Sequence, residues 1–224
     1  MFSSDNHLWL KLWKNKNKNV QFHQWQVNSF LTRFWPDYPE PELLRVFVPC
    51  CGKSLDMLWL AQRGHQVVGV ELSPIAVKAF FKQHQLRPEI KNIGDFSLWQ
   101  CNNISIFCGD FFKLTKALLG EVHMVFDKAA LTALSSPIRK RYASYMTTLI
   151  PHQADIFLLT IEDFSSRLER EQAADIDQEL PLIFKDYSIR LQHVEDETGK
   201  DVPANGLAQA KLYRLKHPLF SIDP

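Results

Sequence analysis

A carboxylate and a turn of small residues are the first groups in this sequence whose types and spacing suit a chemical task. The turn is Pro49-Cys50-Cys51-Gly52, and Glu71 follows its glycine by about 20 residues. Small residues let the backbone approach a ligand closely, and a carboxylate at this spacing accepts hydrogen bonds from both hydroxyls of a ribose. We therefore predict that Gly52 and Glu71 bind a nucleoside cofactor. The alternative is structural, with Glu71 only capping a strand.

The glycine content of the turn indicates which nucleoside fits. A dinucleotide fold normally uses three glycines to bring a pyrophosphate against a helix N-terminus, whereas this turn has only Gly52. The pattern therefore counts against NAD or FAD and favours a nucleoside without phosphates, such as S-adenosyl-L-methionine. A nicotinamide oxidoreductase is the competing hypothesis, although no Tyr-x-x-x-Lys pair follows Asp127.

Further charged residues follow other apolar stretches that we predict to be strands. They are Asp110, the pair Asp127-Lys128 and the pair Glu162-Asp163. The carboxyl ends of the central strands are where α/β enzymes carry their chemistry. For Asp110, a role as the N-cap of a helix is as good an interpretation as a role in ligand binding. For Asp127-Lys128 the alternative is an ion pair or a helix cap.

The elements that would position the turn and the acid are predicted by local signals. Residues 46–48 and 66–70 are apolar, β-rich runs. Between them, Ser54 is a suitable N-cap and Gly64 a suitable residue just past a helix C-terminus. Strand, turn, helix and strand therefore form a βαβ unit, with the turn and the acid at the carboxyl ends of its strands.

The rest of the chain extends this unit into a larger α/β fold. We predict strands at 103–108, 122–126 and 154–161, an antiparallel hairpin of 187–194 with 210–215, and helices at 7–13, 27–34, after Ser73-Pro74, from 129–133 and at 137–150. Residues 86–100 are predicted to form a short hairpin or a loop. The helix at 137–150 is expected to carry arginines on one side. The predicted fold is a doubly wound, mostly parallel seven-stranded sheet with an antiparallel terminal hairpin and an N-terminal helical cover.

Composition narrows the class of protein. The chain has 224 residues, 46% hydrophobic and 23% charged, which suits a single domain over 1–224 that includes residues 1–42 as a cover segment. The net charge of +1 argues against a nucleic-acid surface, and no apolar run reaches the roughly 20 residues of a membrane span. The four cysteines lack metal-site spacing, so we predict reduced thiols, no metal and a cytoplasmic location.

Residues 48–81, VPCCGKSLDMLWLAQRGHQVVGVELSPIAVKAFF, resemble the cofactor-binding segment of the thiopurine S-methyltransferase family in its bacterial form. The segments 9–13, 22–24 and 126–131 resemble the same family, so the likeness covers nearly the whole chain. This resemblance implies a Rossmann-like class I methyltransferase fold and S-adenosyl-L-methionine as the cofactor.

The resemblance also implies roles for single residues. Trp13 is expected against the cofactor, and Asp110 is expected to receive the adenine amino group. Cys50 stands where the family has leucine, at a position that contacts the cofactor largely through its backbone. Lys128 stands where the family has arginine, near the acceptor or the cofactor. His23 belongs to a segment that in the family covers the active site.

Methyl transfer from a sulfonium needs little acid–base help. The donor is already activated, so the enzyme mainly has to orient donor and acceptor in a dry site. A thiol is partly ionised near neutral pH, so His23 is a weak candidate for a general base, and Lys128 is a candidate to favour the thiolate. The expected partner is a small aromatic or heterocyclic thiol, including thiopurines, for a monomeric enzyme. Selenium or tellurium compounds are an alternative substrate class, and a non-catalytic nucleoside-binding member is a third hypothesis.

Overall fold

The computed structural model describes residues 4–15, 26–36, 44–163, 176–197 and 208–220. Its contacts divide the chain into two units, Met1–Leu119 and Gly120–Pro224. Each unit is described by itself below. The prediction that the whole chain forms one domain stays a prediction.

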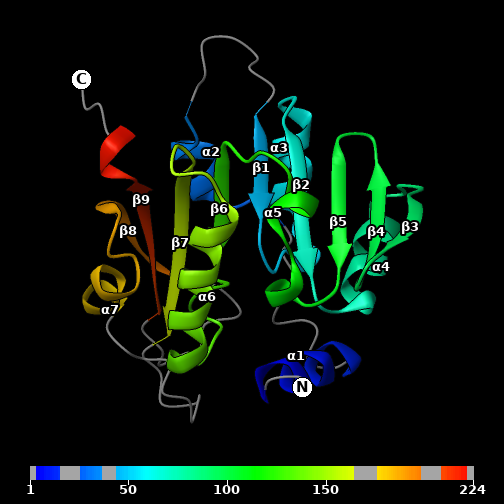
Figure 1. Ribbon diagram of the computed structural model, residues 1–224, viewed down its shortest axis with the longest axis horizontal. Coiled ribbons are helices and arrows are strands. Elements are labelled where there is room, and N and C mark those ends of the chain that lie inside the picture. Colours follow the sequence, from blue (N-terminus) through cyan, green and yellow to red (C-terminus); the bar gives the residue numbers. More distant parts are fainter. Residues whose placement is uncertain (1–3, 16–25, 37–43, 164–175, 198–207, 221–224) are drawn as a thin grey trace. The chain divides into compact units, whose positions relative to one another are not determined.

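The first unit is a five-stranded α/β arrangement. It contains α1 (Ser4–Lys14), α2 (Ser29–Phe34), β1 (Arg45–Val48), α3 (Leu55–Gln62), β2 (Gln66–Glu71), α4 (Pro74–Gln83), β3 (Glu89–Ile93), β4 (Phe96–Cys101), β5 (Ile104–Cys108), the short 3-10 helix η2 (Phe111–Lys113) and α5 (Lys116–Leu119). The strand order is β3-β4-β5-β2-β1. β2 is parallel to both β1 and β5, whereas β4 is antiparallel to β3 and β5. In Figure 1 the arrowheads of β1, β2 and β5 point to the same edge of these strands.

Local signals set the boundaries of the elements around this edge. The side chain of Ser54 caps α3 by accepting the N–H of Asp56 over 3.2 Å, and Gly64 follows the helix with a left-handed φ of +89°. Ser73 caps α4 by accepting the N–H of Ala76 over 3.4 Å. The predicted order of strand, turn, helix and strand is therefore confirmed.

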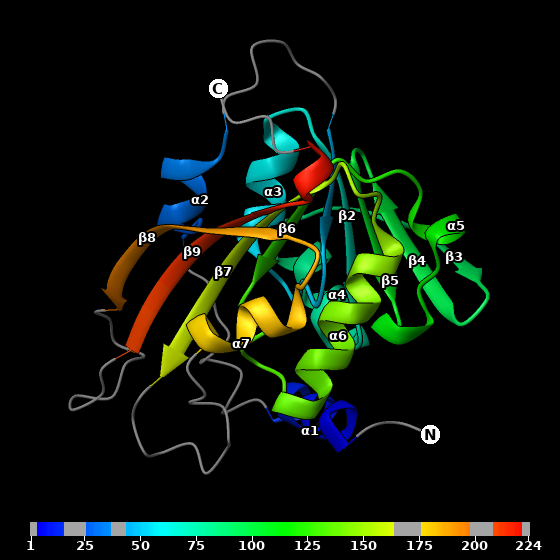
Figure 2. The same ribbon diagram turned by 60° about the vertical axis from the view of Figure 1, so that its left-hand side comes forward.

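The second unit combines a parallel strand pair with a terminal antiparallel hairpin. It contains β6 (Met124–Lys128), α6 (Ser136–Leu149), β7 (Asp155–Asp163), α7 (Ile176–Ile183), β8 (Ser188–Glu197), β9 (Ala208–Lys216) and the 3-10 helix η4 (Pro218–Phe220). The strand order is β6-β7-β9-β8, with β6 parallel to β7 and the other pairs antiparallel. Figure 2 shows α6 and α7 in front of the same face of these strands. The predicted terminal hairpin is confirmed as β8 and β9.

The α/β class is confirmed, but the strand count differs from the prediction. The described residues form nine strands rather than seven, because residues 89–93 and 96–101 pair as the hairpin of β3 and β4. From the sequence, either a short hairpin or a loop was predicted for this stretch. Exposed charged residues in β3 hide the alternation that normally marks a strand. No helix in the described ranges is long and apolar enough to cross a membrane.

Two expectations about the helical parts of the second unit are wrong. Residues 129–133 form a turn, and the helix begins only at Ser136, because Ala129 has a left-handed φ of +58° that no right-handed helix can include. Arg139 does not lie on an exposed charged side of α6. It is fully buried, with its Nε 3.1 Å from Glu179 Oε2 on α7. A carboxylate on the second helix therefore compensates the buried charge.

Candidate functional site

Glu71 and Gly52, separated by 19 positions, are in direct contact at the carboxyl end of β2. The Gly52 N–H donates to Glu71 Oε2 over 2.9 Å, and the Ser73 N–H donates to Oε1 over 2.7 Å. The contact forms because the turn after β1 folds back on itself: Cys50 and Gly52 have left-handed φ values of +48° and +55°. The structure thus brings together the two residues on which the cofactor prediction rests.

The surroundings of Glu71 suit a group that receives hydrogen bonds. Its side chain is buried, with 6% of the residue exposed. Burial raises the pKa of Glu71 to about 6, while the backbone N–H groups of Ser73 and Gly52 act in the opposite direction by favouring the ionised form. An ionised carboxylate offers about four lone-pair sites. The backbone N–H groups of Ser73, Gly52 and Leu72 favour the ionised form, and the four sites outnumber these three donors, so the carboxylate can also accept a hydroxyl of a sugar.

Trp13 and the two adjacent cysteines define the surroundings of the turn. A Cβ added to Gly52 would stand 3.5 Å from the ring of Trp13, so the indole packs on the backbone of the turn. Cys50 is exposed and Cys51 is buried. A Cβ on Gly69 would lie only 2.7 Å from the Cys51 sulfur, so β2 needs a glycine there to admit this thiol. The structure therefore also brings Trp13 and Cys50 to the predicted site.

Asp110 lies beside Glu71 on the neighbouring strand end. Glu71 pairs with Cys108 in the β2–β5 register, and Asp110 follows two residues later. Its Oδ1 accepts the N–H of Phe112 over 3.0 Å, and its Oδ2 accepts the side-chain amide of Asn6 over 3.1 Å. The capping interpretation of Asp110 is thus observed, while its contact with adenine stays a prediction. The two roles are compatible, because each carboxylate oxygen has a second lone pair.

Two residues around this site were not recognised as such from the sequence. Asp56 is fully buried and accepts the hydroxyl of Ser54 over 2.9 Å and the N–H of Asn28 over 2.7 Å, which ties the start of α2 to the start of α3. Asn6 contacts Asp110, as described above. The signal for Asn6 was its spacing of seven residues from Trp13, since positions i and i+7 share one face of a helix.

In the second unit, Lys128 and Asp127 have different environments although they are neighbours. Lys128 ends β6 and is half-buried, and the next residue, Ala129, donates its N–H to the carbonyl of Leu159 over 2.8 Å. Asp127 is buried and accepts the hydroxyl of Tyr142 over 2.7 Å. Burial raises the pKa of Asp127 to about 6, while the bond from Tyr142 favours the ionised form. The backbone N–H groups of Ala130 and Leu131 also favour the ionised form, so Asp127 holds the turn that follows Lys128.

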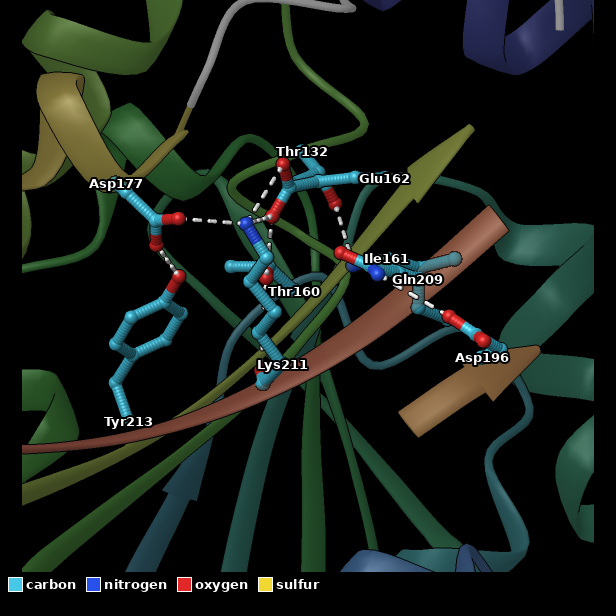
Figure 3. Close-up of polar contacts among 9 residues, drawn as sticks. All are labelled: Thr132, Thr160, Ile161, Glu162, Asp177, Asp196, Gln209, Lys211 and Tyr213. Carbon is cyan, nitrogen blue, oxygen red and sulfur yellow. Dashed lines mark hydrogen bonds and ion pairs between the residues drawn. The ribbon is translucent and has the colours of Figure 1, made fainter. Parts of the chain in front are cut away.

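A polar cluster around Lys211 lies in the same unit (Figure 3). Lys211 Nζ is 2.7 Å from Asp177 Oδ2 and 3.2 Å from Glu162 Oε1, and Tyr213 donates its hydroxyl to Asp177. Thr160 donates to Glu162 over 3.4 Å. Because Thr160 lies opposite Lys211 in the β7–β9 register, all these side chains share one face of the strands. Glu162, which the sequence predicts at the ligand end of its strand, lies near the end of β7 and pairs with Lys211.

Two predictions are still to be compared with the structure: His23 as a cover residue, and the absence of a metal site. His23 lies outside the described residues. Within the part of the chain that the structure describes, no three His, Cys, Asp or Glu side chains gather in a way that could hold a metal ion. The described site is thus an arrangement of carboxylates, backbone N–H groups and one indole.

The arrangement of strands and helices defines the class of protein. The chain matches a SAM-dependent methyltransferase from Anabaena variabilis with a TM-score of 0.63 and 15% identity, over 96% of each chain. It also matches magnesium protoporphyrin IX methyltransferase from Synechocystis with bound SAH, with a TM-score of 0.62 and 15% identity, over 95% of this chain and 100% of that one. At such identities the likeness concerns the fold, which is that of class I S-adenosyl-L-methionine-dependent methyltransferases.

Sequence comparison defines the family within this class. A family model described as Thiopurine S-methyltransferase (TPMT) matches residues 4–216. A thiopurine S-methyltransferase of Stutzerimonas stutzeri is 44% identical over 223 residues, which are 99% of this chain and 92% of that protein. One of Pseudomonas fluorescens is 37% identical over 213 residues, 93% of this chain and 97% of that protein. The chain belongs to the thiopurine S-methyltransferase family, and the predicted S-adenosyl-L-methionine-dependent methyltransferase is confirmed.

Proposed function

We propose that the enzyme methylates the sulfur of small aromatic or heterocyclic thiols, thiopurines among them. The observation that carries the proposal is the buried carboxylate of Glu71, held on the backbone N–H groups of Gly52 and Ser73 at the end of β2. The relatives named thiopurine S-methyltransferase support the choice of acceptor. In the reaction the acceptor sulfur forms a new bond to the methyl carbon, the old sulfonium bond breaks, and the thiol proton passes to solvent.

The residues of the first unit fit the cofactor. When bound, S-adenosyl-L-methionine supplies a methyl group that its sulfonium already activates. Glu71 would accept hydrogen bonds from the ribose hydroxyls, because its carboxylate has lone-pair capacity beyond that used by the backbone N–H groups around it. The turn at Cys50 and Gly52 would hold the amino-acid part through its backbone, and Trp13 would cover it. Asp110 would accept the adenine amino group.

Two residues carry proposals for the acceptor. An ammonium group near the acceptor favours a thiolate over a thiol. We assign this role to Lys128, and we assign His23 to the cover of the acceptor rather than to proton transfer. Lys128→Met should then raise the apparent pKa seen in the pH–rate profile for a thiol acceptor, with cofactor affinity unchanged. An unchanged profile would show that Lys128 does not act on the acceptor.

Turnover of a thiopurine tests the proposed function directly. The enzyme is incubated with S-adenosyl-L-methionine and a thiopurine, and both S-adenosyl-L-homocysteine and the S-methylated product are quantified. Equal amounts of the two products are expected. Binding of the cofactor without turnover of any thiol would indicate the non-catalytic alternative. Turnover with selenium or tellurium compounds but with no thiol would replace the proposed substrate class.

The proposal includes a cellular location and an oligomeric state for the enzyme. All four cysteines are free thiols, which suits a reducing compartment. We therefore assign the protein to the cytoplasm, as a monomer that detoxifies small molecules and binds no nucleic acid. The net charge of +1 is consistent with this last point. Light scattering during gel filtration tests the monomer, and fractionation of cells tests the location.

A further inference from the structure

The end of β6 is joined to β7 by a side-chain hydroxyl that interrupts the ladder of backbone hydrogen bonds. Lys128 lies opposite Leu159 in the register of these parallel strands, and the N–H of Ala129 donates to the carbonyl of Leu159 over 2.8 Å. In a regular parallel ladder the next bond would run from the N–H of Ile161 to the carbonyl of Ala129. Here the hydroxyl of Thr132 is inserted between these two groups.

The hydroxyl of Thr132 acts as an acceptor and as a donor. It accepts the N–H of Ile161 over 3.5 Å, as Figure 3 shows. It also donates to the carbonyl of Ala129 over 3.3 Å. Thr132 is buried, so both backbone groups depend on the protein for their hydrogen bonds. One side chain therefore replaces a single bond of the ladder with two consecutive ones.

The inserted hydroxyl accompanies an unfavourable backbone conformation. Ala129 has a left-handed φ of +58°, which is costly for a residue with a Cβ, so its surroundings must hold it there. Its N–H is held by Leu159, and its carbonyl is held by the hydroxyl of Thr132 and by the N–H of Ala133 over 2.9 Å. Because Lys128 directly precedes Ala129, these contacts fix the backbone from which the Lys128 side chain extends.

We propose that Thr132 is a positioning residue that holds Lys128 in place for the acceptor. This inference rests on the proposed function, which assigns Lys128 to the thiolate of the acceptor. Thr132 does not touch the acceptor and acts only through the turn after Lys128. The essential group is the hydroxyl, because it must accept and donate at the same time. Serine keeps such a group, whereas valine keeps the shape of threonine without it.

Two substitutions at Thr132 separate its hydroxyl from its shape. The rate of thiopurine methylation is measured against pH at saturating S-adenosyl-L-methionine for the wild type, Thr132→Val, Thr132→Ser and Lys128→Met. Thr132→Val should shift the apparent pKa in the same direction as Lys128→Met and lower the rate at pH 7 at least about fivefold, the value of one hydrogen bond. Thr132→Ser should keep the profile of the wild type. Calorimetry should show the same affinity for S-adenosyl-L-homocysteine in both Thr132 variants.

Thr160→Val is the matched control. Thr160 is also buried, but its hydroxyl donates to Glu162 and not to the turn after Lys128. Its loss should lower the melting temperature without shifting the pH–rate profile. If Thr132→Val does not fold, Thr132→Val combined with Ala129→Gly takes its place. Glycine adopts a left-handed φ without steric cost, so the double variant should fold and still show the shifted profile.

Each result has a distinct meaning. A shift in Thr132→Val that Thr132→Ser and Thr160→Val lack supports the proposal. If Lys128→Met shifts the profile but Thr132→Val does not, or if Thr132→Ser or Thr160→Val shifts it equally, the inference is overturned and the proposed function stands. An unchanged profile in Lys128→Met overturns the role of Lys128 and this inference with it. No turnover of any thiol by the wild type would overturn the proposed function and this inference together.

Discussion

Glu71 in the first unit and Glu162 in the second make an instructive pair. Each lies at the carboxyl end of a strand with a parallel neighbour, each is buried, with 6% and 4% exposed, and burial raises the pKa of each. Their partners differ. Glu71 is held by the backbone N–H groups of Gly52 and Ser73, whereas Glu162 is paired with the ammonium of Lys211.

This difference in partners indicates which buried carboxylate can accept hydrogen bonds from a ligand. Backbone N–H groups stabilise the carboxylate of Glu71 but leave it with a net negative charge and with lone pairs. Lys211 forms an ion pair with Glu162 and also with Asp177, so the carboxylate of Glu162 already has a cationic partner within the fold. We therefore propose that the first arrangement serves cofactor binding, whereas the second joins elements of the fold. Four experiments would break or sharpen this comparison.

The largest effect is expected from Glu71→Ala. Two charge-assisted hydrogen bonds to the ribose are lost, each worth about 1.5 to 3 kcal/mol, so affinity for S-adenosyl-L-homocysteine should fall at least about a hundredfold. Isothermal calorimetry measures this change. The control Glu89→Ala removes an exposed carboxylate of the same unit and should leave the affinity unchanged. Undiminished binding by Glu71→Ala would remove the basis of the cofactor site.

Lys211→Met should act on stability instead. It leaves the buried Glu162 without its cation, which costs about 3 kcal/mol in the free energy of unfolding. Urea denaturation measures this loss. Cofactor affinity should change less than about twofold, because the described partners of Lys211, Glu162 and Asp177, are not residues assigned to the cofactor. Lys113→Met breaks an exposed pair with Asp95 and should leave the urea midpoint unchanged. A stable Lys211→Met protein with lost cofactor binding would reverse the comparison.

Tyr142→Phe should produce a smaller and pH-dependent loss. It removes the hydroxyl that donates to Asp127, which costs about 2 kcal/mol for a bond to a buried carboxylate. That bond favours the ionised form, so its removal raises the pKa of Asp127 further above about 6. The loss should therefore be larger at pH 8, where Asp127 is ionised, than at pH 5, where it is protonated. Thermal unfolding of Tyr142→Phe and of the control Tyr145→Phe at both pH values checks this sign.

The smallest effect is the pH dependence of binding by Glu71. The ribose hydroxyls donate to the ionised form, so protonation competes with the ligand and affinity falls as pH falls through about 6. From pH 7 to pH 5 the affinity should drop about tenfold. 5′-Methylthioadenosine is the suitable ligand, because it has no carboxylate or amine that titrates in this range. An affinity that does not change with pH would show that Glu71 does not bind the sugar in its ionised form.

The βαβ unit could be predicted because its signals are local. Ser54, Gly64 and Ser73 mark helix ends by their own conformational preferences, and each is found where it was expected. The contact of Gly52 with Glu71 follows from the same unit, since parallel strands end at one edge. This part of the site was therefore accessible from the sequence.

Long-range pairing was not accessible in the same way. Glu162 pairs with Lys211, which lies 49 residues later in the chain, and Arg139 pairs with Glu179 on another helix. Nothing in the neighbouring sequence distinguishes such a residue from an exposed charge, so both pairs were missed. The turn after Lys128 was mistaken for a helix, because its alanines favour a helix while the left-handed φ of Ala129 is imposed by contacts with β7.

The fit of the Cys51 thiol against Gly69 has a consequence for an enzyme that handles an electrophile. Burial raises the pKa of Cys51 well above its ordinary value, and the nearby negative charge of Glu71 raises it further. Only a thiolate attacks an alkyl donor readily. Burial first, and then the charge of Glu71, therefore favour the protonated form of the Cys51 thiol. A protonated Cys51 is a poor acceptor for a methyl group, so this buried thiol is protected from methylation by the enzyme's own donor.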